Sequence, residues 1–335
     1  MNIQGICING DSAHFGGSLE QLRQDLTFFQ SCEFDGVEVS VDGLDAIIGG
    51  RLRQAQVDRI RAITEQYEFI YSVHPTGSLN LAFPPKAPDG QRALELEKEL
   101  MAACLHFCAA IGSHVLVYHS GLIGLQEVAA GLDDLPGLDE LEEARQREVA
   151  ALRELLPLAA DLGVIVGMEN RDPHPWEIAT LRRAGLGLDD LLTYHGGLSI
   201  PNLVRQIEEV DHPNLGITLD LGHLYVAANL LGFDFLEAVR QAAPHLRHIH
   251  SHDNMGRLGS VRTTMHDRLS FGDGDLHMPI GWGTIPHAQV LAQLAGYDGL
   301  YVLEIMPRFR EHYPEALQTA RALIDGIAHG AESSQ

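Results

Sequence analysis

The sequence predicts an α/β protein of one domain, folded as a TIM (β/α)8 barrel. Short runs of β-branched and aliphatic residues alternate along the chain with longer amphipathic segments. Eight strand–helix units in strict alternation favour parallel strands joined by right-handed crossovers, and eight is the number that closes a TIM barrel. A doubly wound open sheet is the alternative. No G-x-G-x-x-G motif follows the first strand, which argues against the dinucleotide-binding form of that fold.

The strand candidates are short apolar runs, as expected for strands that are buried on both faces of a parallel sheet. In chain order they cover residues 4–9, 36–41, 69–73, 114–118, 164–168, 215–219, 247–249 and 300–303.

The helix candidates repeat apolar residues at helical spacing, and Ser18 is a suitable N-cap for the first. The stretch 171–199 is less regular, and a Gly-rich loop follows the seventh strand. In chain order the helix candidates cover residues 19–32, 52–67, 91–111, 138–162, 201–209, 233–243, 288–295 and 314–328.

The length of 335 residues would allow about two domains, but α/β barrels often use ~250 residues or more as one. No low-complexity linker divides the chain. We therefore expect one barrel domain at 1–329 and a disordered tail at 330–335.

The composition excludes several classes of protein. There are 46 acidic and 23 basic residues, a formal net charge of −23, and the only lysines are Lys86 and Lys98. This balance argues against nucleic acid as partner or substrate. No apolar run reaches the ~20 residues that span a bilayer, and the first residues do not form a signal peptide. Four cysteines do not make a disulfide scaffold, so we expect a cytoplasmic protein without a membrane partner.

Six successive strand candidates end in a residue that can bind a divalent metal ion. These residues are His74, His119, Glu169, Asp220, His250 and Glu304. In a barrel such strand ends converge on one mouth. Burying so many unpaired carboxylates and imidazoles together is costly, and bound cations remove that cost.

Three more ligand candidates, His223, Asp275 and His277, lie in loops that follow strands six and seven. Imidazole and carboxylate together suit zinc, iron or manganese. No cysteine belongs to the set, which argues against a structural zinc site of the cysteine type.

Several short motifs accompany these ligands. They are DGVEV at 35–39, YHS at 118–120, MEN at 168–170, LDLGH at 219–223, HSHDN at 250–254, DLHMPIGWG at 275–283 and LEI at 303–305. In their order along the chain, these motifs resemble those of the xylose-isomerase-like TIM barrel superfamily. That superfamily includes sugar phosphate isomerases and epimerases as well as endonuclease IV. The resemblance covers nearly the whole chain.

The resemblance implies between one and three divalent ions, with zinc expected first and manganese or iron as alternatives. The epimerase pattern holds one ion with Glu169, Asp220, His250 and Glu304. The endonuclease IV pattern adds a second ion on His74, His119 and bridging Glu169, and a third on His223, Asp275 and His277. Simple epimerases usually lack the Asp-x-His pair, so Asp275 and His277 depart from their pattern.

Two chemistries follow from the resemblance. In the first, which we favour, Glu169 and Glu304 act as an acid/base pair that moves a proton on a small sugar, polyol or sugar phosphate, with His223 as a proton shuttle. In the second, a trinuclear centre hydrolyses or cleaves a small phosphate ester or amide. The Asp275–His277 pair favours the second chemistry. A metal-loaded barrel that binds a ligand without catalysis is a third alternative, and a homo-oligomer is also left open.

The remaining candidates are expected to contact the substrate. Arg262 and Arg308 are suited to a phosphate group, as are the nearby His266, Arg268 and Arg310. The substrate-binding candidates are His14, Glu38, Asn170, His252, Arg262, Trp282 and Arg308.

Overall fold

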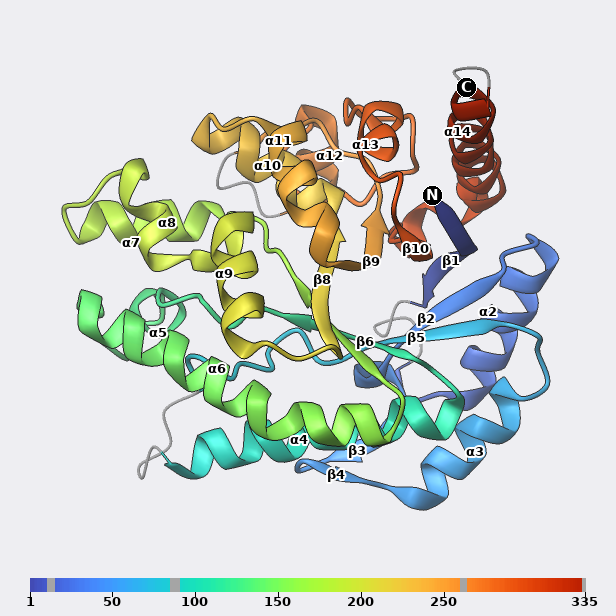
Figure 1. The fold of residues 1–335 in the computed structure, drawn as a ribbon, viewed down its shortest axis with the longest axis horizontal. Coiled ribbons are helices and arrows are strands. Elements are labelled where there is room, and N and C mark those ends of the chain that lie inside the picture. Colours follow the sequence, from blue (N-terminus) through green and yellow to red (C-terminus); the bar gives the residue numbers. More distant parts are fainter. Residues whose placement is uncertain (11–15, 85–90, 260–263, 333–335) are drawn as a thin grey trace.

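The computed structural model describes residues 1–10, 16–84, 91–259 and 264–332. Within these ranges, parallel strands close into a barrel in the order β1-β10-β9-β8-β7-β6-β5-β2 (Figure 1). The predicted TIM barrel is therefore confirmed, and the open sheet is excluded. The barrel strands are β1 (Asn2–Gly10), β2 (Gly36–Ser40), β5 (Ile70–His74), β6 (Val115–His119), β7 (Ile165–Glu169), β8 (Leu215–Asp220), β9 (Leu246–Ser251) and β10 (Asp298–Leu303).

The predicted helices surround the barrel, and neighbours from α3 to α14 contact one another around it (Figure 1). The helix predicted at 91–111 has the bounds of α4, and Ser18 caps the first helix through Gln21 N at 3.2 Å. The outer helices are α2 (Leu19–Ser31), α3 (Gln54–Thr64), α4 (Gln91–Ile111), α6 (Leu138–Asp161), α9 (Ile200–Val210), α11 (Phe235–Ala242), α13 (His287–Gln293) and α14 (Tyr313–Glu332).

The structure corrects two predicted boundaries. The helix expected from residue 52 begins at Gln54, because β3 (Ile47–Ile48) and β4 (Arg51–Leu52) form a hairpin around two glycines with φ of 59° and 72°. The last helix, expected to end at residue 328, continues to Glu332, and residues 333–335 lie outside the described ranges.

Several helices have no counterpart in the prediction. The stretch 171–199 contains α7 (Pro175–Arg183) and α8 (Leu191–Tyr194), and the loops contain α5 (Gln126–Ala129) and α12 (Met265–Phe271). Most important for the site is α10 (Leu221–Leu231), which begins directly after β8. Because α10 is apolar on most sides, its sequence does not show a clear helical period.

The apolar core lies mainly between strands and helices, while part of the barrel interior is polar. Glu38 of β2 accepts a hydrogen bond from Ser72 at 2.9 Å and contacts His248 of β9 at 2.9 Å. Since β2 and β9 are not neighbours in the sheet, this contact crosses the barrel interior. All three side chains are buried.

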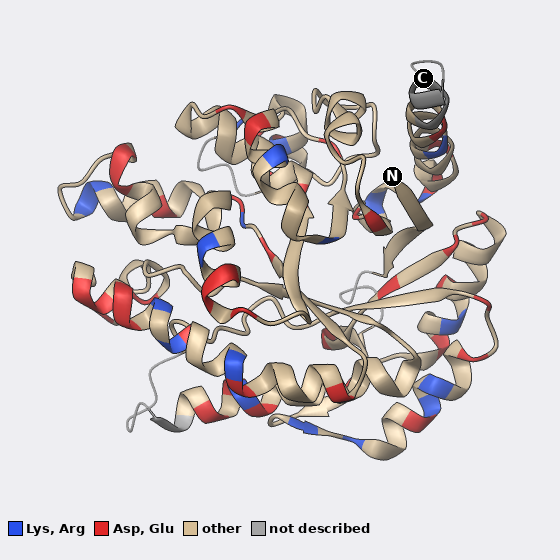
Figure 2. Ribbon diagram, viewed as in Figure 1, with Lys and Arg blue, Asp and Glu red and all other residues tan. Residues whose placement is uncertain are grey.

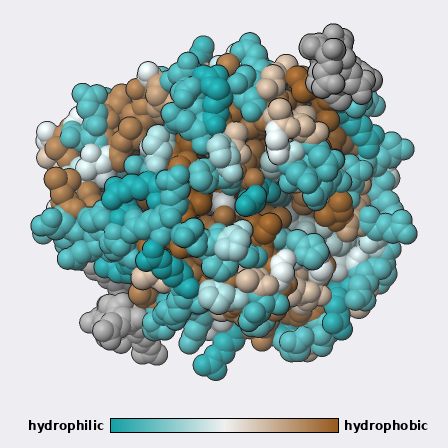
Figure 3. Space-filling model, in the orientation of Figure 1, coloured by the Kyte–Doolittle hydropathy of each residue, from teal (hydrophilic) through white to brown (hydrophobic). Residues whose placement is uncertain are grey.

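The outer surface carries both signs of charge. Acidic and basic residues are interspersed along the outer helices (Figure 2), and hydrophobic patches on the same face are broken up by hydrophilic residues (Figure 3). No helix in the described part of the chain is long and apolar enough to cross a membrane.

Glu148 fastens α6 to the barrel. Its fully buried carboxylate accepts hydrogen bonds from Tyr118 Oη at 2.5 Å, Gln206 Nε2 at 2.6 Å and Gly121 N at 2.7 Å. Burial raises the pKa of Glu148, although these donors oppose the shift. The contacts with Tyr118 and Gly121 lie on both sides of the strand end that carries His119.

We predict that Glu148→Ala destabilises the fold by about 3 kcal/mol, because it leaves buried donors without an acceptor. Thermal unfolding monitored by circular dichroism measures this loss. Glu143→Ala, an exposed glutamate on the same helix, is the matched control and should change stability by less than about 0.5 kcal/mol. Equal melting temperatures for the two variants would contradict the role of Glu148.

Candidate metal centre

The strand ends bring the six predicted ligands to one mouth of the barrel. Because the strands are parallel, their carboxyl ends lie on the same face. The residues involved are His74 on β5, His119 on β6, Glu169 on β7, Asp220 on β8, His250 on β9 and Glu304 just after β10. Contacts between these side chains divide them into adjoining groups.

The first group contains Glu169, Asp220, His250 and Glu304, whose ligand atoms lie within 4.8 Å of one another. His250 Nδ1 is 3.1 Å from Glu169 Oε1, 3.2 Å from Glu304 Oε2 and 4.0 Å from Asp220 Oδ2. We call this group the tetrad. Its carboxylates thus surround one imidazole nitrogen, and only Glu304, with 16% of its side chain exposed, reaches the surface.

The charges within the tetrad suit a cation. Burial on its own would raise the pKa of Glu169, but the imidazoles of His119 and His250 lower it well below its usual value. Burial would likewise lower the pKa of His250, but Glu38, Glu169 and Glu304 raise it. Asp220 Oδ2 and Glu304 Oε2 have no hydrogen-bond donor among the described residues. The residues therefore fit a divalent ion, which would supply the positive charge that these carboxylates lack.

The second group adds His74 and His119 to Glu169. The Nε2 atoms of His119 and His74 lie 2.9 and 3.7 Å from Glu169 Oε2. His74 Nδ1 is 2.8 Å from the carbonyl oxygen of Pro75, which can only accept, so Nδ1 carries a proton. In the neutral ring Nε2 then presents a lone pair toward a carboxylate, as a metal ligand does.

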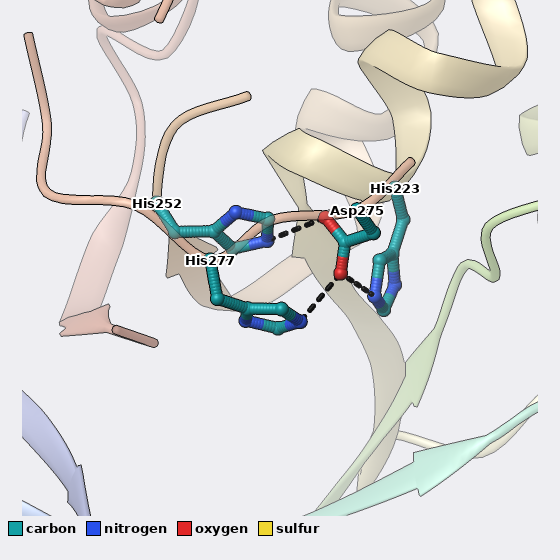
Figure 4. A group of neighbouring side chains, drawn as sticks. All are labelled: His223, His252, Asp275 and His277. Carbon is teal, nitrogen blue, oxygen red and sulfur yellow. Dashed lines mark ion pairs between the residues drawn. The ribbon is translucent and has the colours of Figure 1, made fainter. Parts of the chain in front are cut away.

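The third group surrounds Asp275 with the imidazoles of His223, His252 and His277 (Figure 4). Asp275 Oδ2 contacts His277 Nε2 and lies 3.5 Å from His223 Nε2, while Oδ1 lies 3.5 Å from His252 Nε2. The structure thus brings together the predicted residues His223, Asp275 and His277. It also adds His252, which was predicted as a substrate contact.

A cavity of about 290 Å³ opens beside these groups. Glu304, His74 and His277 form part of its wall, so the tetrad and both other groups border the same space. Its other lining residues include Asn9, Glu38, Ser40 and Asp42. A cavity bordered by convergent polar groups with shifted pKa values is the default candidate for a small-molecule site.

Two predicted substrate residues contact the ligand candidates. Glu38, although it reaches the cavity, places Oε1 3.0 Å from His250 Nε2. Asn170 donates from Nδ2 to Asp220 O at 3.0 Å and accepts from Asp220 N at 2.9 Å. Because this pair of bonds joins the residues just after β7 and at the end of β8, it fixes the relative positions of Glu169 and Asp220.

Trp282 and Arg308 do not line the cavity. The indole of Trp282 packs on Phe309 at 5.6 Å between ring centroids and lies 3.4 Å from Glu315 Oε1. Arg308 is exposed and stands over Phe309. In the structure both side chains contact Phe309 instead of lining this cavity, and their role in substrate binding stays a prediction.

The other predicted cations are also engaged elsewhere or not described. Arg310 pairs with Asp25 at 2.8 Å, and Arg268 donates to the carbonyl oxygen of Asp275 at 2.6 Å. His266 is exposed on α12. His14 and Arg262 lie outside the described residues.

Sequence reasoning missed the residues that hold the loop bearing Asp275 and His277. The backbones of Asp253 and Met278 exchange hydrogen bonds of 2.8 and 3.0 Å. The Asp253 carboxylate also accepts from Gly281 N at 2.9 Å and Ile285 N at 3.2 Å. The HSHDN motif was the available signal, since Asp253 follows two of the site histidines there.

Comparisons with known proteins agree with the barrel. The model of the family described as xylose isomerase-like TIM barrel matches residues 26–325. The uncharacterized protein MJ1311 of Methanocaldococcus jannaschii is 25% identical over 292 residues, which are 85% of this chain and 79% of that protein.

Solved structures of similar fold include several sugar epimerases. A D-tagatose 3-epimerase-like protein has a TM-score of 0.67 at 22% identity, over 97% of this chain and 100% of that chain. An L-ribulose 3-epimerase has a TM-score of 0.66 at 15% identity, over 100% and 98%. The D-psicose 3-epimerase of Clostridium cellulolyticum H10 has a TM-score of 0.63 at 16% identity, over 96% and 99%. At these sequence identities the similarity supports the fold alone.

The family match extends over nearly all of the barrel, from within α2 to within α14, and it includes every ligand candidate of the three groups. The resemblance seen in the motifs is therefore confirmed: this chain belongs to the xylose isomerase-like TIM barrel family.

Proposed function

We propose that the protein is a divalent-metal-dependent isomerase or epimerase that moves a proton on a small sugar, polyol or sugar phosphate. The observation that carries this proposal is the position of Glu304, which belongs to the tetrad and also lines the cavity. A carboxylate placed beside both an ion and a substrate is suited to proton transfer. The structural neighbours named as 3-epimerases support the same class of reaction.

The tetrad residues Glu169, Asp220, His250 and Glu304 would hold the ion, and their nitrogen and oxygen donors suit zinc, manganese or iron. When bound, such an ion polarises a carbonyl and its neighbouring hydroxyl, which makes the adjacent C–H bond more acidic.

Glu304 faces the substrate side and takes or returns the proton at its carboxylate. Burial would raise its pKa, but His250 and His277 lower it, so the Glu304 carboxyl group is ionised at neutral pH. Glu169 is the second member of the acid/base pair and also contacts His250 Nδ1, but it is fully buried beside His74 and His119. His223 is less suited to a shuttle, since its Nδ1 is held by Asn170 O and its Nε2 faces Asp275.

Glu304→Gln should lower the rate of proton exchange at least about 100-fold, because an amide cannot accept the substrate proton. The assay follows incorporation of solvent deuterium into a panel of ketoses by NMR, with enzyme reloaded with zinc or manganese. Glu311→Gln, an exposed glutamate near the start of α14, is the control. If the Glu304 variant exchanges protons as fast as the control, Glu304 does not carry the proton.

Glu169→Gln should lose bound metal while the barrel stays folded, because Glu169 oxygens face both the tetrad and the pair His74 and His119. Elemental analysis of protein purified without chelator gives the metal content, and circular dichroism checks the fold. A metal content equal to that of Glu311→Gln would refute the assignment of Glu169 as a ligand.

A second candidate function, hydrolysis of a small phosphate ester or amide, is favoured by one feature of Glu169. Its Oε1 lies toward His250 and its Oε2 toward His119 and His74, the arrangement of a carboxylate that bridges two ions. Two adjacent ions can activate water for such a hydrolysis.

The variant His119→Gln separates the two functions. If hydrolysis is the reaction, this change should abolish turnover of aryl phosphates and aryl amides, because the second ion loses a ligand. If proton transfer is the reaction, ketose exchange should persist in the variant and the wild type should not cleave either ester or amide. Both assays use the same zinc-loaded and manganese-loaded preparations.

A further inference from the structure

We propose that His223, His252, Asp275 and His277 form a closed metal site that fastens the connection between β9 and β10 and takes no part in the reaction. The inference deepens the proposed isomerase function, on which its mechanistic consequence rests. The existence of the site depends only on the residues of the third group.

The donor set has the size of a tetrahedral zinc site. Three imidazole nitrogens and a carboxylate oxygen lie within 4.8 Å of one another. Bonds of about 2.0–2.1 Å in a tetrahedron place ligand atoms about 3.3–3.4 Å apart. Asp275 Oδ2 lies 3.5 Å from His223 Nε2, and the other oxygen, Oδ1, lies 3.5 Å from His252 Nε2, so the carboxylate is near that spacing from each ring.

Backbone carbonyls fix the rings of His223 and His277 for metal binding. His223 Nδ1 is 3.0 Å from Asn170 O, and His277 Nδ1 is 2.8 Å from Glu304 O. Because a carbonyl oxygen only accepts, Nδ1 of each ring carries a proton, and Nε2 of the neutral ring presents a lone pair. Both Nε2 atoms face Asp275 (Figure 4), so the ring nitrogens and carboxylate oxygens converge where a cation would join them.

His252 supplies the fourth ligand. Its side chain is fully buried, and neither ring nitrogen has a hydrogen-bond partner among the described residues. Its Nε2 faces Asp275 (Figure 4) and also lies 3.3 Å from Asp220 Oδ2. A buried imidazole without a partner is costly, and an ion beside Asp275 would satisfy it.

The absence of a side chain at Gly222 leaves room for the imidazole of His252. A Cβ atom at Gly222 would lie only 1.9 Å from His252 Cε1. The glycine of the LDLGH motif therefore allows the first turn of α10 to pass beside His252, and the same turn carries His223.

A fourth protein ligand changes what an ion at this place can do. Structural zinc sites are closed by four protein ligands, whereas catalytic sites keep a position open for water or substrate. With His252 as ligand, the ion has no position for a leaving group. The Asp275–His277 pair, which favoured hydrolysis when taken from the sequence alone, then serves to hold a loop.

The backbone of this loop has an unusual conformation at one of the proposed ligands. His277 has a φ of +43°, a left-handed conformation that is unusual for a residue other than glycine. It also lines the cavity close to Glu304. An ion bound to His223 and His252 would tie this part of the cavity wall to α10 and β9.

The first test measures metal content and thermal stability of zinc-reloaded protein. His252→Gln and Gly222→Ala should each lose about one zinc equivalent relative to wild type, and their melting temperatures should respond less to added zinc. His266→Ala, an exposed histidine in the same connection, is the matched control and should keep the wild-type content. The Gly222 variant keeps all four ligands in the sequence, so it tests the position of His252 even if the His252 variant folds poorly.

The second test asks whether the site is closed. In cobalt-substituted protein, the visible absorption that is present in wild type and lost in His252→Gln should not change when inorganic phosphate is added. A phosphate-dependent change would show an open position and overturn the closed site. Equal zinc content in wild type and both variants would overturn the site itself. Neither measurement requires turnover, so a failure of the proposed isomerase activity would be seen separately, in the ketose exchange assay.

Discussion

The carboxylate of Glu169 imposes the main constraint on the barrel mouth. It has no exposed surface, and burying an ionised carboxylate is costly unless positive charge or donors surround it. Its two oxygens face different partners, with His250 on one side and His119 and His74 on the other. Imidazoles at the ends of β5, β6 and β9 surround the Glu169 carboxylate at the end of β7. The closed parallel barrel brings these strand ends together on one face.

The residues around the ligands then fix their orientation. Glu38 approaches His250 Nε2 across the barrel interior, which leaves Nδ1 to face the tetrad carboxylates. Asn170 fixes Asp220 through its backbone, and Asp220 accepts a hydrogen bond from His223 N as the N-cap of α10. One residue thus ends a strand, caps a helix and belongs to the tetrad. Such supporting contacts restrict the rotamers and protonated nitrogens of ligands before any ion binds.

The strand-end ligands could be predicted because their positions follow from local sequence and one topological rule. Apolar runs identify the strands, and parallel strands end on one face, so His74, His119 and Glu169 had to be near one another. The substrate residues could not be predicted in this way. Trp282 and Arg308 lie in or near loops, where packing on Phe309 decides their direction.

The contact of His252 with Asp275 also could not be predicted from the sequence. Strand alternation places it on the same side as His250, but its partner depends on where α10 begins. No helix was expected there, because a helix that is apolar on most sides lacks the periodic pattern on which prediction relies. The hairpin before α3 was missed for a related reason: two-residue strands are too short to show alternation.

The three groups use the same residue types, so exposure separates their roles. Glu304, His74 and His277 border the cavity, whereas Asp220, His250 and His252 are fully buried. The cavity wall therefore includes one member of each group. The tetrad offers it a carboxylate, and the other two groups offer imidazoles, whose Nδ1 atoms are already engaged by backbone carbonyls. In the proposed isomerase reaction, Glu304 is therefore the carboxylate placed to transfer the proton, and the buried residues set the charge and position of the groups around it.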